Sequence, residues 1–131
     1  MLEERLSGQV LEAFFTVYHE HGHGFLETVY VNSLVVELEA RGLNVQRELA
    51  MDVRYRGRIV GRYRADLAIE SRVLVEVKAI KQLVEADQRQ LINYLKASPI
   101  EVGLLLNFGP EPKFLRRILT NDRKHSGEAT P

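Results

Sequence analysis

The segment from Arg62 to Lys78 constrains the fold of this chain more than any other stretch. Two apolar runs, Ile59 to Ile69 and Val73 to Val77, flank a short polar break, which is the pattern of a β-hairpin. Side chains alternate between the two faces of a strand, so Glu76 and Lys78 point to one face and the valines of that run to the other. The sequence therefore predicts a carboxylate and an ammonium group side by side.

Asp66 lies on the first strand of this hairpin, where antiparallel pairing brings it close to Glu76. Adjacent carboxylates repel each other unless a cation lies between them or one of them takes up a proton. Oxygen ligands in a chain without cysteine suit Mg²⁺ or Mn²⁺ rather than Zn²⁺. These residues predict a metal site that activates water against a phosphodiester. An exposed hairpin face with alternating acid and base, serving solubility, is the other interpretation.

The length and composition indicate one soluble globular domain. The chain has 131 residues, 45% of them hydrophobic and 27% charged, which is enough for a single core without disulfides or a structural metal. The absence of cysteine excludes disulfides, thiol redox chemistry and zinc ribbons. We expect residues 1–120 to form this domain and the polar residues 121–131 to be a disordered C-terminal tail.

The charge pattern bears on location and partners. The chain has 18 basic and 18 acidic residues, so any contact with nucleic acid must come from local clusters. Two acids near the N-terminus are unlike a signal peptide, and no apolar run approaches about 18 residues. We therefore expect a cytoplasmic protein without membrane contact.

Two N-terminal helices are predicted, from Leu6 to about His21 and from Glu27 to Arg41, because apolar residues recur at steps of three and four. Glu27 falls on the apolar stripe of the second helix. It is a candidate third acid of the site, and a simple first-turn acid that complements the helix dipole is an equally weighted alternative. The histidines between these helices are interpreted as a polar turn rather than as metal ligands.

Arginines gather on the strands before the acids. Residues 45–55 predict a strand that turns into the next one, so that three consecutive strands form an antiparallel meander. Arg54, Arg56 and Arg58 near the turn, with Arg62 and Arg64 beyond it, form a basic stripe. Arg58, Arg62 and Arg64 are its candidate nucleic-acid contacts, beside the proposed metal site, where a phosphate backbone could approach. Solvated strand arginines are the alternative for each of them.

The C-terminal half predicts a helical crossover. A helix is expected from Leu83 to about Ala97, with Gln90 and Tyr94 on one face. The apolar run from Glu101 to Asn107 predicts a buried strand parallel to an earlier one, and residues 114–119 predict a short edge strand.

This order of elements, with Asp on the second strand and Glu-x-Lys on the third, resembles the PD-(D/E)XK nuclease superfamily. Within it the chain is similar to the GxxExxY protein family, whose motif stands here as Gly24-Phe-Leu-Glu-Thr-Val-Tyr30. The segment Gln90-Leu-Ile-Asn-Tyr94 is similar to a motif of RecB-like members. The resemblance covers about residues 6–119 and implies a mixed α/β fold with a restriction-endonuclease-like core. That core has three antiparallel strands, a helical crossover and a parallel strand, flanked by helices.

The resemblance also implies roles. Asp66, Glu76 and the carbonyl of Val77 would bind Mg²⁺ or Mn²⁺, and Glu27 would complete or orient the metal shell. Lys78 would position the attacking water or stabilise the charge on the phosphate, with Gln90 and Tyr94 orienting this face. Tyr30 is assigned to nucleic-acid contact together with Arg58, Arg62 and Arg64. Ala65 stands where the superfamily name has proline, which supplies no ligand.

The resemblance implies a metal-dependent nuclease that hydrolyses DNA phosphodiester bonds. The alternative is a nucleic-acid-binding or assembly module that keeps the nuclease fold and does not cut. Homo-oligomerisation is a further expectation, because so small a domain often gains substrate contact by self-association.

Overall fold

The computed structural model describes residues 2–124 and contains three α-helices and five β-strands over that range. In chain order the elements are α1 (Glu4–His21), α2 (Glu27–Ala40), β1 (Val45–Tyr55), β2 (Arg58–Ile69), β3 (Val73–Lys78), α3 (Glu85–Lys96), β4 (Val102–Phe108), β5 (Pro112–Ile118) and a 3₁₀ helix, η1 (Asn121–Arg123).

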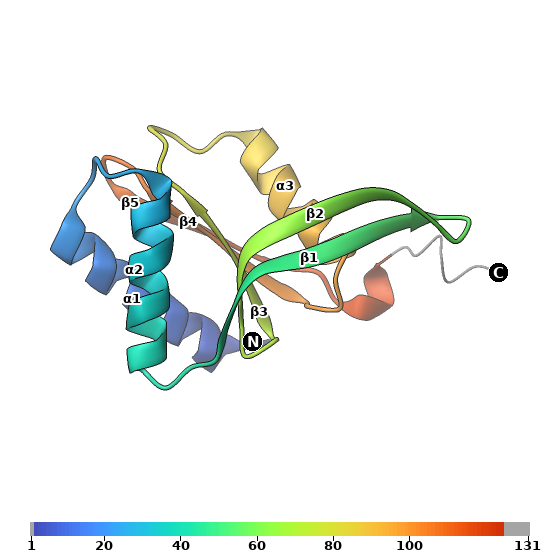
Figure 1. The fold of residues 1–131 in the computed structure, drawn as a ribbon, viewed down its shortest axis with the longest axis horizontal. Coiled ribbons are helices and arrows are strands. Elements are labelled where there is room, and N and C mark those ends of the chain that lie inside the picture. The colour runs from blue at the N-terminus through green and yellow to red at the C-terminus, as the bar shows by residue number, and fades with distance from the viewer. Residues whose placement is uncertain (1, 125–131) are drawn as a thin grey trace.

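The five strands form one mixed sheet in the order β1-β2-β3-β4-β5. All neighbouring strands are antiparallel except β3 and β4, which run parallel and are joined by α3. Every residue of β4 is buried, as expected for a strand covered on both faces. The predicted meander, helical crossover, parallel strand and edge strand are therefore confirmed (Figure 1).

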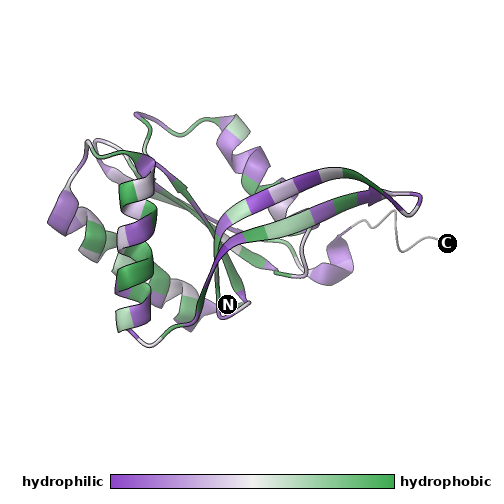
Figure 2. Ribbon diagram, in the orientation of Figure 1, coloured by the Kyte–Doolittle hydropathy of each residue, from purple (hydrophilic) through white to green (hydrophobic). Residues whose placement is uncertain are grey.

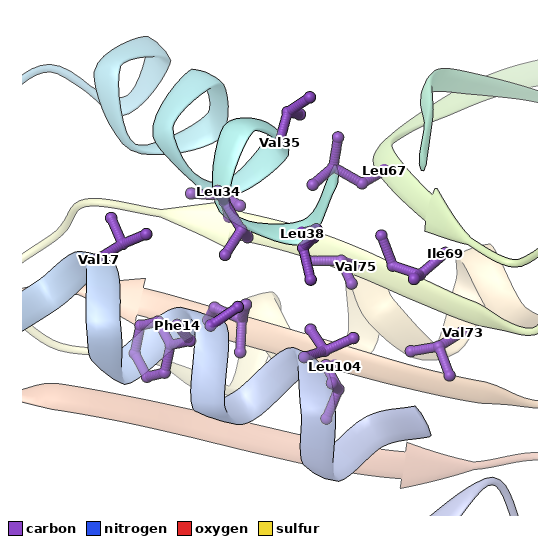
Figure 3. Close-up of a cluster of buried hydrophobic side chains, with 14 of the residues drawn as sticks. Phe14, Val17, Leu34, Val35, Leu38, Leu67, Ile69, Val73, Val75 and Leu104 are labelled. Atoms are coloured by element: carbon purple, nitrogen blue, oxygen red, sulfur yellow. The ribbon is translucent and has the colours of Figure 1, made fainter. Parts of the chain in front are cut away.

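Helices α1 and α2 cover one face of the sheet. Phe14 and Val17 of α1 meet Leu34 and Leu38 of α2 above Val75 (Figure 3). These side chains are almost fully removed from water, which is the main favourable contribution to folding. The regular spacing of apolar residues along both helices accounts for this docking.

Helix α3 covers the other face, where Leu91 and Leu95 pack against Leu74 and Leu105. Residues of β3 therefore alternate between two cores: the three valines face α1 and α2, and Leu74 faces α3. By this alternation Glu76 points to the α3 side, and it is only 6% exposed. An acid thus occupies a position that packing alone would give to an apolar residue.

The strands β1 and β2 continue beyond the rest of the sheet as a two-stranded arm, on the right of Figure 1. Both strands of the arm mix hydrophilic and hydrophobic residues (Figure 2). At its base Met51 and Tyr63 pack in the α3 core, whereas residues 54–60 are all exposed. The base of the arm is therefore anchored and its tip projects into solvent.

Residues 121–123, assigned to the tail from the sequence, form a 3₁₀ turn instead of continuing the polar tail. The Lys124 ammonium donates to the carbonyls of Ser98 and Ile100 at 2.8 and 2.7 Å, which holds this turn against the chain after α3. The remainder of the predicted tail, residues 125–131, lies outside the described residues. Between residues 2 and 124, no helix has the length and apolar character needed to cross a membrane.

Candidate active site

The candidate site lies where β2 and β3 separate. Their ladder ends at the pair Leu67 and Val75. Beyond it, Glu76 Oε1 accepts a hydrogen bond from the Asp66 N–H at 3.0 Å, and Asp66 Oδ2 accepts one from the Val77 N–H at 2.7 Å. Two carboxyl groups thus replace the missing ladder bonds, because buried backbone N–H groups require partners. The strands diverge and leave the two acids adjacent.

Burial strongly perturbs Glu76. It raises the pKa of Glu76 to about 8, and the negative charges of Asp66 and Glu27 act in the same direction. The Asp66 N–H and the Lys78 ammonium oppose this shift. A carboxyl with such a pKa holds a proton near neutral pH unless a cation offsets the cost of its charge.

The pKa of Asp66 is also raised by burial, in a position that is only partly exposed. Hydrogen bonds from the Val77 N–H and from the Glu76 side chain partly offset that effect, as does the charge of Lys78. The pair therefore behaves as two acids that share one desolvated place, in which ionisation of both is unfavourable.

Lys78, the last residue of β3, is half-buried beside these acids. Its positive charge lowers the pKa of Glu27, of Asp66 and of Glu76. One amine thus interacts with all three predicted acids, which come from α2, β2 and β3.

The chain after Lys78 is held by Asn107, which lies opposite Lys78 in the β3–β4 ladder. The buried Asn107 carboxamide accepts from the Ile80 N–H and donates to the Ile80 carbonyl, both at 3.0 Å. The sequence analysis did not select Asn107, because the partner is a backbone segment 27 residues away. The signal in the sequence that could have identified Asn107 is its polar side chain within the otherwise apolar strand β4.

Replacement of Asn107 by leucine is expected to lower the free energy of unfolding, by about 1 to 3 kcal/mol for each Ile80 group left unpaired. Urea denaturation of the two proteins measures this change. Asn93→Leu, at an exposed position of α3, is the matched control and should change stability by no more than about 0.5 kcal/mol. Equal losses in both variants would show that the Asn107 hydrogen bonds contribute nothing specific.

Glu27 is the first residue of α2 and lies at the surface, so the expectation that it is buried on the apolar stripe is wrong. The buried stripe of α2 begins one turn later, at Tyr30. Glu27 and Asp66 nevertheless line one open pocket of about 410 Å³. Partial desolvation raises the pKa of Glu27, and the charge of Asp66 adds to this shift.

Tyr30 is not available to nucleic acid, and its assignment as a contact residue is wrong. Its ring is fully buried and stacks on Phe108 with a centroid distance of 4.3 Å. The hydroxyl donates to the Gly22 carbonyl at 2.6 Å and accepts from the Phe25 N–H at 3.2 Å. Tyr30 therefore holds the loop that leads into Glu27.

Gln90 and Tyr94 lie one turn apart on the face of α3 that meets the sheet. Burial, with smaller contributions from the negative charges of Glu76 and Asp66, raises the pKa of Tyr94 to about 12. The Tyr94 hydroxyl therefore stays protonated beside these acids. The Gln90 Oε1 atom is buried and has no hydrogen-bond partner within residues 2–124. A buried polar atom of this kind usually has a partner.

Glu48 is an acid near the site that the sequence analysis missed. The ladder pairs Arg47 with Leu67 and Leu49 with Ala65, and the intervening residues Glu48 and Asp66 are irregular. Glu48 has a left-handed backbone with φ 52 and lines the same pocket as Asp66. Burial is the main cause of the raised pKa of Asp66, and the negative charge of Glu48 raises it further. Counting the register back from the turn does not place Glu48 opposite Asp66, because a bulge at Val53 and Arg54 shifts the pairing by one residue.

The three candidate nucleic-acid contacts of the basic stripe, Arg58, Arg62 and Arg64, are exposed on β2. Across the β1–β2 ladder, Arg62 Nε lies 3.3 Å from Asp52 Oδ1, and Arg64 Nη1 lies 3.4 Å from Glu48 Oε1. Arg64 also lines the pocket with Asp66, so the stripe reaches the candidate site.

The histidines have structural partners. His21 Nε2 is 2.7 Å from the Ser33 hydroxyl, and His23 Nδ1 is 3.1 Å from the Phe108 carbonyl. Over the part of the chain that the structure describes, no three His, Asp or Glu side chains are grouped closely enough to hold a metal ion. Asp66 and Glu76 thus form a pair, with Glu27 farther out on the pocket rim.

The site and its fold can be compared with known proteins. A family model described as the PD-(D/E)XK nuclease superfamily matches residues 4–118, the span from the start of α1 to the end of β5. The chain belongs to the PD-(D/E)XK nuclease superfamily.

A solved structure has a similar fold. The crystal structure of SSO0001 matches with a TM-score of 0.59 at 18% sequence identity, over 74% of this chain and 52% of that one. The chain thus spans about half the length of SSO0001, and the likeness concerns the fold alone. The expected restriction-endonuclease-like fold is confirmed. No curated protein sequence matches the chain.

The donor set of this superfamily member fits a hard divalent cation. Its candidate ligands are carboxylate and carbonyl oxygens, which Mg²⁺ and Mn²⁺ prefer. The raised pKa values of Asp66 and Glu76 reflect an excess of buried acid that a cation would relieve. The unpartnered Gln90 oxygen indicates that the site lacks a polar group it can accommodate.

Proposed function

We propose that this protein is a metal-dependent nuclease that hydrolyses DNA phosphodiester bonds. The observation that carries the proposal is the pair of buried carboxyl groups, Asp66 and Glu76, beside Lys78 at the divergence of two strands in a PD-(D/E)XK fold. The Gly24–Tyr30 segment, in which Tyr30 holds the loop before Glu27, supports placement among the GxxExxY proteins.

Asp66, Glu76 and the Val77 carbonyl would hold Mg²⁺ or Mn²⁺, and Glu27 would complete the shell from the pocket rim. The cation, when bound, supplies Lewis acidity to the phosphate and lowers the pKa of water. It would also permit both carboxyl groups to be ionised at once, which burial otherwise opposes.

Lys78 has the position for the charge that develops on the phosphate. Its ammonium would donate a hydrogen bond to a non-bridging oxygen as water attacks, a new P–O bond forms and the ester P–O bond breaks. The attacking water gives up one proton to solvent, and the leaving oxygen takes up one proton from solvent. Tyr94 stays protonated and can donate to the same group or to the acids. Gln90 would accept a hydrogen bond from the attacking water at its unpartnered Oε1 atom.

Arg58, Arg62 and Arg64 would bind DNA phosphates. All three are exposed on one strand, and Arg64 borders the pocket that contains Asp66. Guanidinium groups pair with phosphate oxygens without reading the bases, so these contacts would position the DNA rather than select a sequence.

The test is an assay of plasmid and end-labelled oligonucleotide DNA with purified protein in Mg²⁺, in Mn²⁺ and in EDTA. We expect nicking or degradation in the metal ions and none in EDTA. Salt-dependent DNA binding without cleavage in any divalent metal would replace the proposal with the non-cleaving binding or assembly module. Activity that persists in EDTA would contradict the metal assignment.

A further inference from the structure

The hairpin arm, defined as residues 53–64, is the β1–β2 segment in which positive charge is concentrated. It contains five arginines and no acid, although the whole chain has zero net charge. Its turn at Arg56 and Gly57 has φ values of 50 and 80, the two-residue form that suits the twist of paired strands. The ladder runs up to this turn with one bulge, at Val53 and Arg54, so the arm is a paired two-stranded ribbon rather than a loose loop.

The tip of the arm has no partner in the rest of the described chain. Tyr55 and Val60 are 64% and 63% exposed, although both are large and apolar. Within residues 2–124, Asp52 pairs with Arg54 and Arg62, whereas Arg56 and Arg58 have no ion pair. Positive charge and apolar surface are therefore both available at the far end.

The arm is continuous with the candidate site. Strand β2 carries both Arg58 at the tip and Asp66 in the site, eight residues apart. At about 3.4 Å per strand residue, this distance is about 27 Å along the strand. A DNA duplex rises about 3.4 Å per base pair, so the arm is about as long as 8 base pairs.

We propose that the hairpin arm lies in a groove of duplex DNA, so that the substrate is a duplex extending about 8 base pairs to one side of the cleaved bond. This inference rests on the proposed nuclease function. A two-stranded ribbon fits the major groove of B-DNA, with guanidinium groups at its edges reaching phosphates on both sides.

The shape of the arm favours a duplex over a single strand. Single strands bind in basic grooves of a protein, where bases stack on aromatic side chains. The arm is the opposite shape, because it projects from the body (Figure 1) and residues 54–60 are exposed all around it. A projecting basic ribbon complements a concave, anionic partner, and the groove of a duplex is such a surface.

The test compares DNA binding by the wild-type and Arg56→Gln/Arg58→Gln proteins in EDTA. Fluorescence anisotropy measures the binding constant K at several salt concentrations. We expect the slope of log K against log salt for a long duplex to fall by about 2, and binding to weaken about tenfold. Arg5→Gln/Arg72→Gln removes the same charge from exposed positions outside the arm and should leave the slope unchanged. Arg56→Glu/Arg58→Glu, whose charge is reversed, should weaken binding further.

Duplex length gives an independent measurement. Binding should weaken sharply when the duplex beyond the cleavage point is cut from about 12 to about 4 base pairs, and the arm variant should lose this dependence. Equal effects of the arm and control variants, absence of duplex binding by the wild-type protein, or an arm effect limited to single strands would each overturn the inference.

Two outcomes separate this inference from the proposed function. If the wild-type protein cleaves DNA and the arm variant binds duplex DNA normally, the proposed role of the arm is rejected and the proposed nuclease function is retained. If duplex binding depends on the arm but no divalent metal supports cleavage, the proposed nuclease function is rejected and the role of the arm in duplex binding is retained. Loss of a dimer in the arm variant, measured by sedimentation without any change in DNA binding, would assign the arm to a second copy of the chain and overturn the inference.

Discussion

Replacement of Lys78 by alanine is expected to slow metal-dependent DNA cleavage by about a hundred- to a thousandfold. Lys78 is the amine whose charge reaches Glu27, Asp66 and Glu76 together, at the end of β3 beside the pocket. Its removal would withdraw the donor that faces the phosphate when negative charge develops. The single-turnover rate with saturating protein measures the chemical step apart from binding.

Lys81→Ala is the matched control for this experiment. Lys81 is exposed and lies three residues along the chain, in the loop after β3. The control removes the same charge outside the acid pair and should cut DNA at nearly the wild-type rate. Full activity of the Lys78→Ala protein would sink the assignment, whereas a Lys78→Arg protein with partial activity would indicate that positive charge is the main requirement.

Glu76→Gln is expected to make the metal-free protein more stable at a pH of about 8 and to remove its response to metal. Burial raises the pKa of Glu76 from 4.5 to about 8, so between these values the folded protein keeps a proton that the unfolded chain releases. The free energy of unfolding therefore falls as the pH rises through this window. Glutamine retains an oxygen for the Asp66 N–H and has no such proton to lose.

Thermal unfolding in EDTA across this pH window measures the effect. The wild-type Tm should decrease toward the upper end, whereas the variant should show a flatter profile and a Tm higher by on the order of 5 °C there. Asp66, whose pKa burial also raises, interacts with Glu76, so the difference between the two profiles reports the titration of the pair. A steeper fall in the variant than in the wild type would contradict the buried-acid description.

Metal titration completes this prediction. Mg²⁺ or Mn²⁺ should raise the Tm of the wild-type protein at the upper pH and should release protons on binding, because the ligands must ionise. The Glu76→Gln protein should respond little, and Glu111→Gln, at an exposed site in the loop before β5, should respond as the wild type does. Equal stabilisation of Glu76→Gln would place the metal elsewhere.

Much of the fold could be predicted from local pattern. The alternation in residues 73–78 placed the valines on one face and Glu76 on the other, and the structure divides β3 between its two cores in that way. The periodicity of α1 and α2, and the apolar run that became β4, were equally informative. These signals are readable because each reports which side of one element is buried.

The site was less predictable where its geometry depends on two elements. Tyr30 carries an aromatic ring and a hydroxyl in a motif segment, features shared by a ligand-contacting residue and a core residue. Only the docking of α2 against Phe108 decided that its ring is buried. Glu27 likewise shares the helical phase of the stripe, and only the packing of α2 in the folded chain, which buries the helix from Tyr30 onward, decided that Glu27 is exposed.

By itself, the sequence determined the order of elements, the faces of β3 and the nearness of Asp66 to Glu76, because hairpin pairing and strand alternation act over a few residues. The tertiary structure alone decided that the β2–β3 ladder ends at Leu67, that both carboxyl groups take over its backbone hydrogen bonds, and that Glu48 joins their pocket. The reason is physical: desolvation and strand divergence depend on contacts between segments far apart in the chain, which no local pattern encodes.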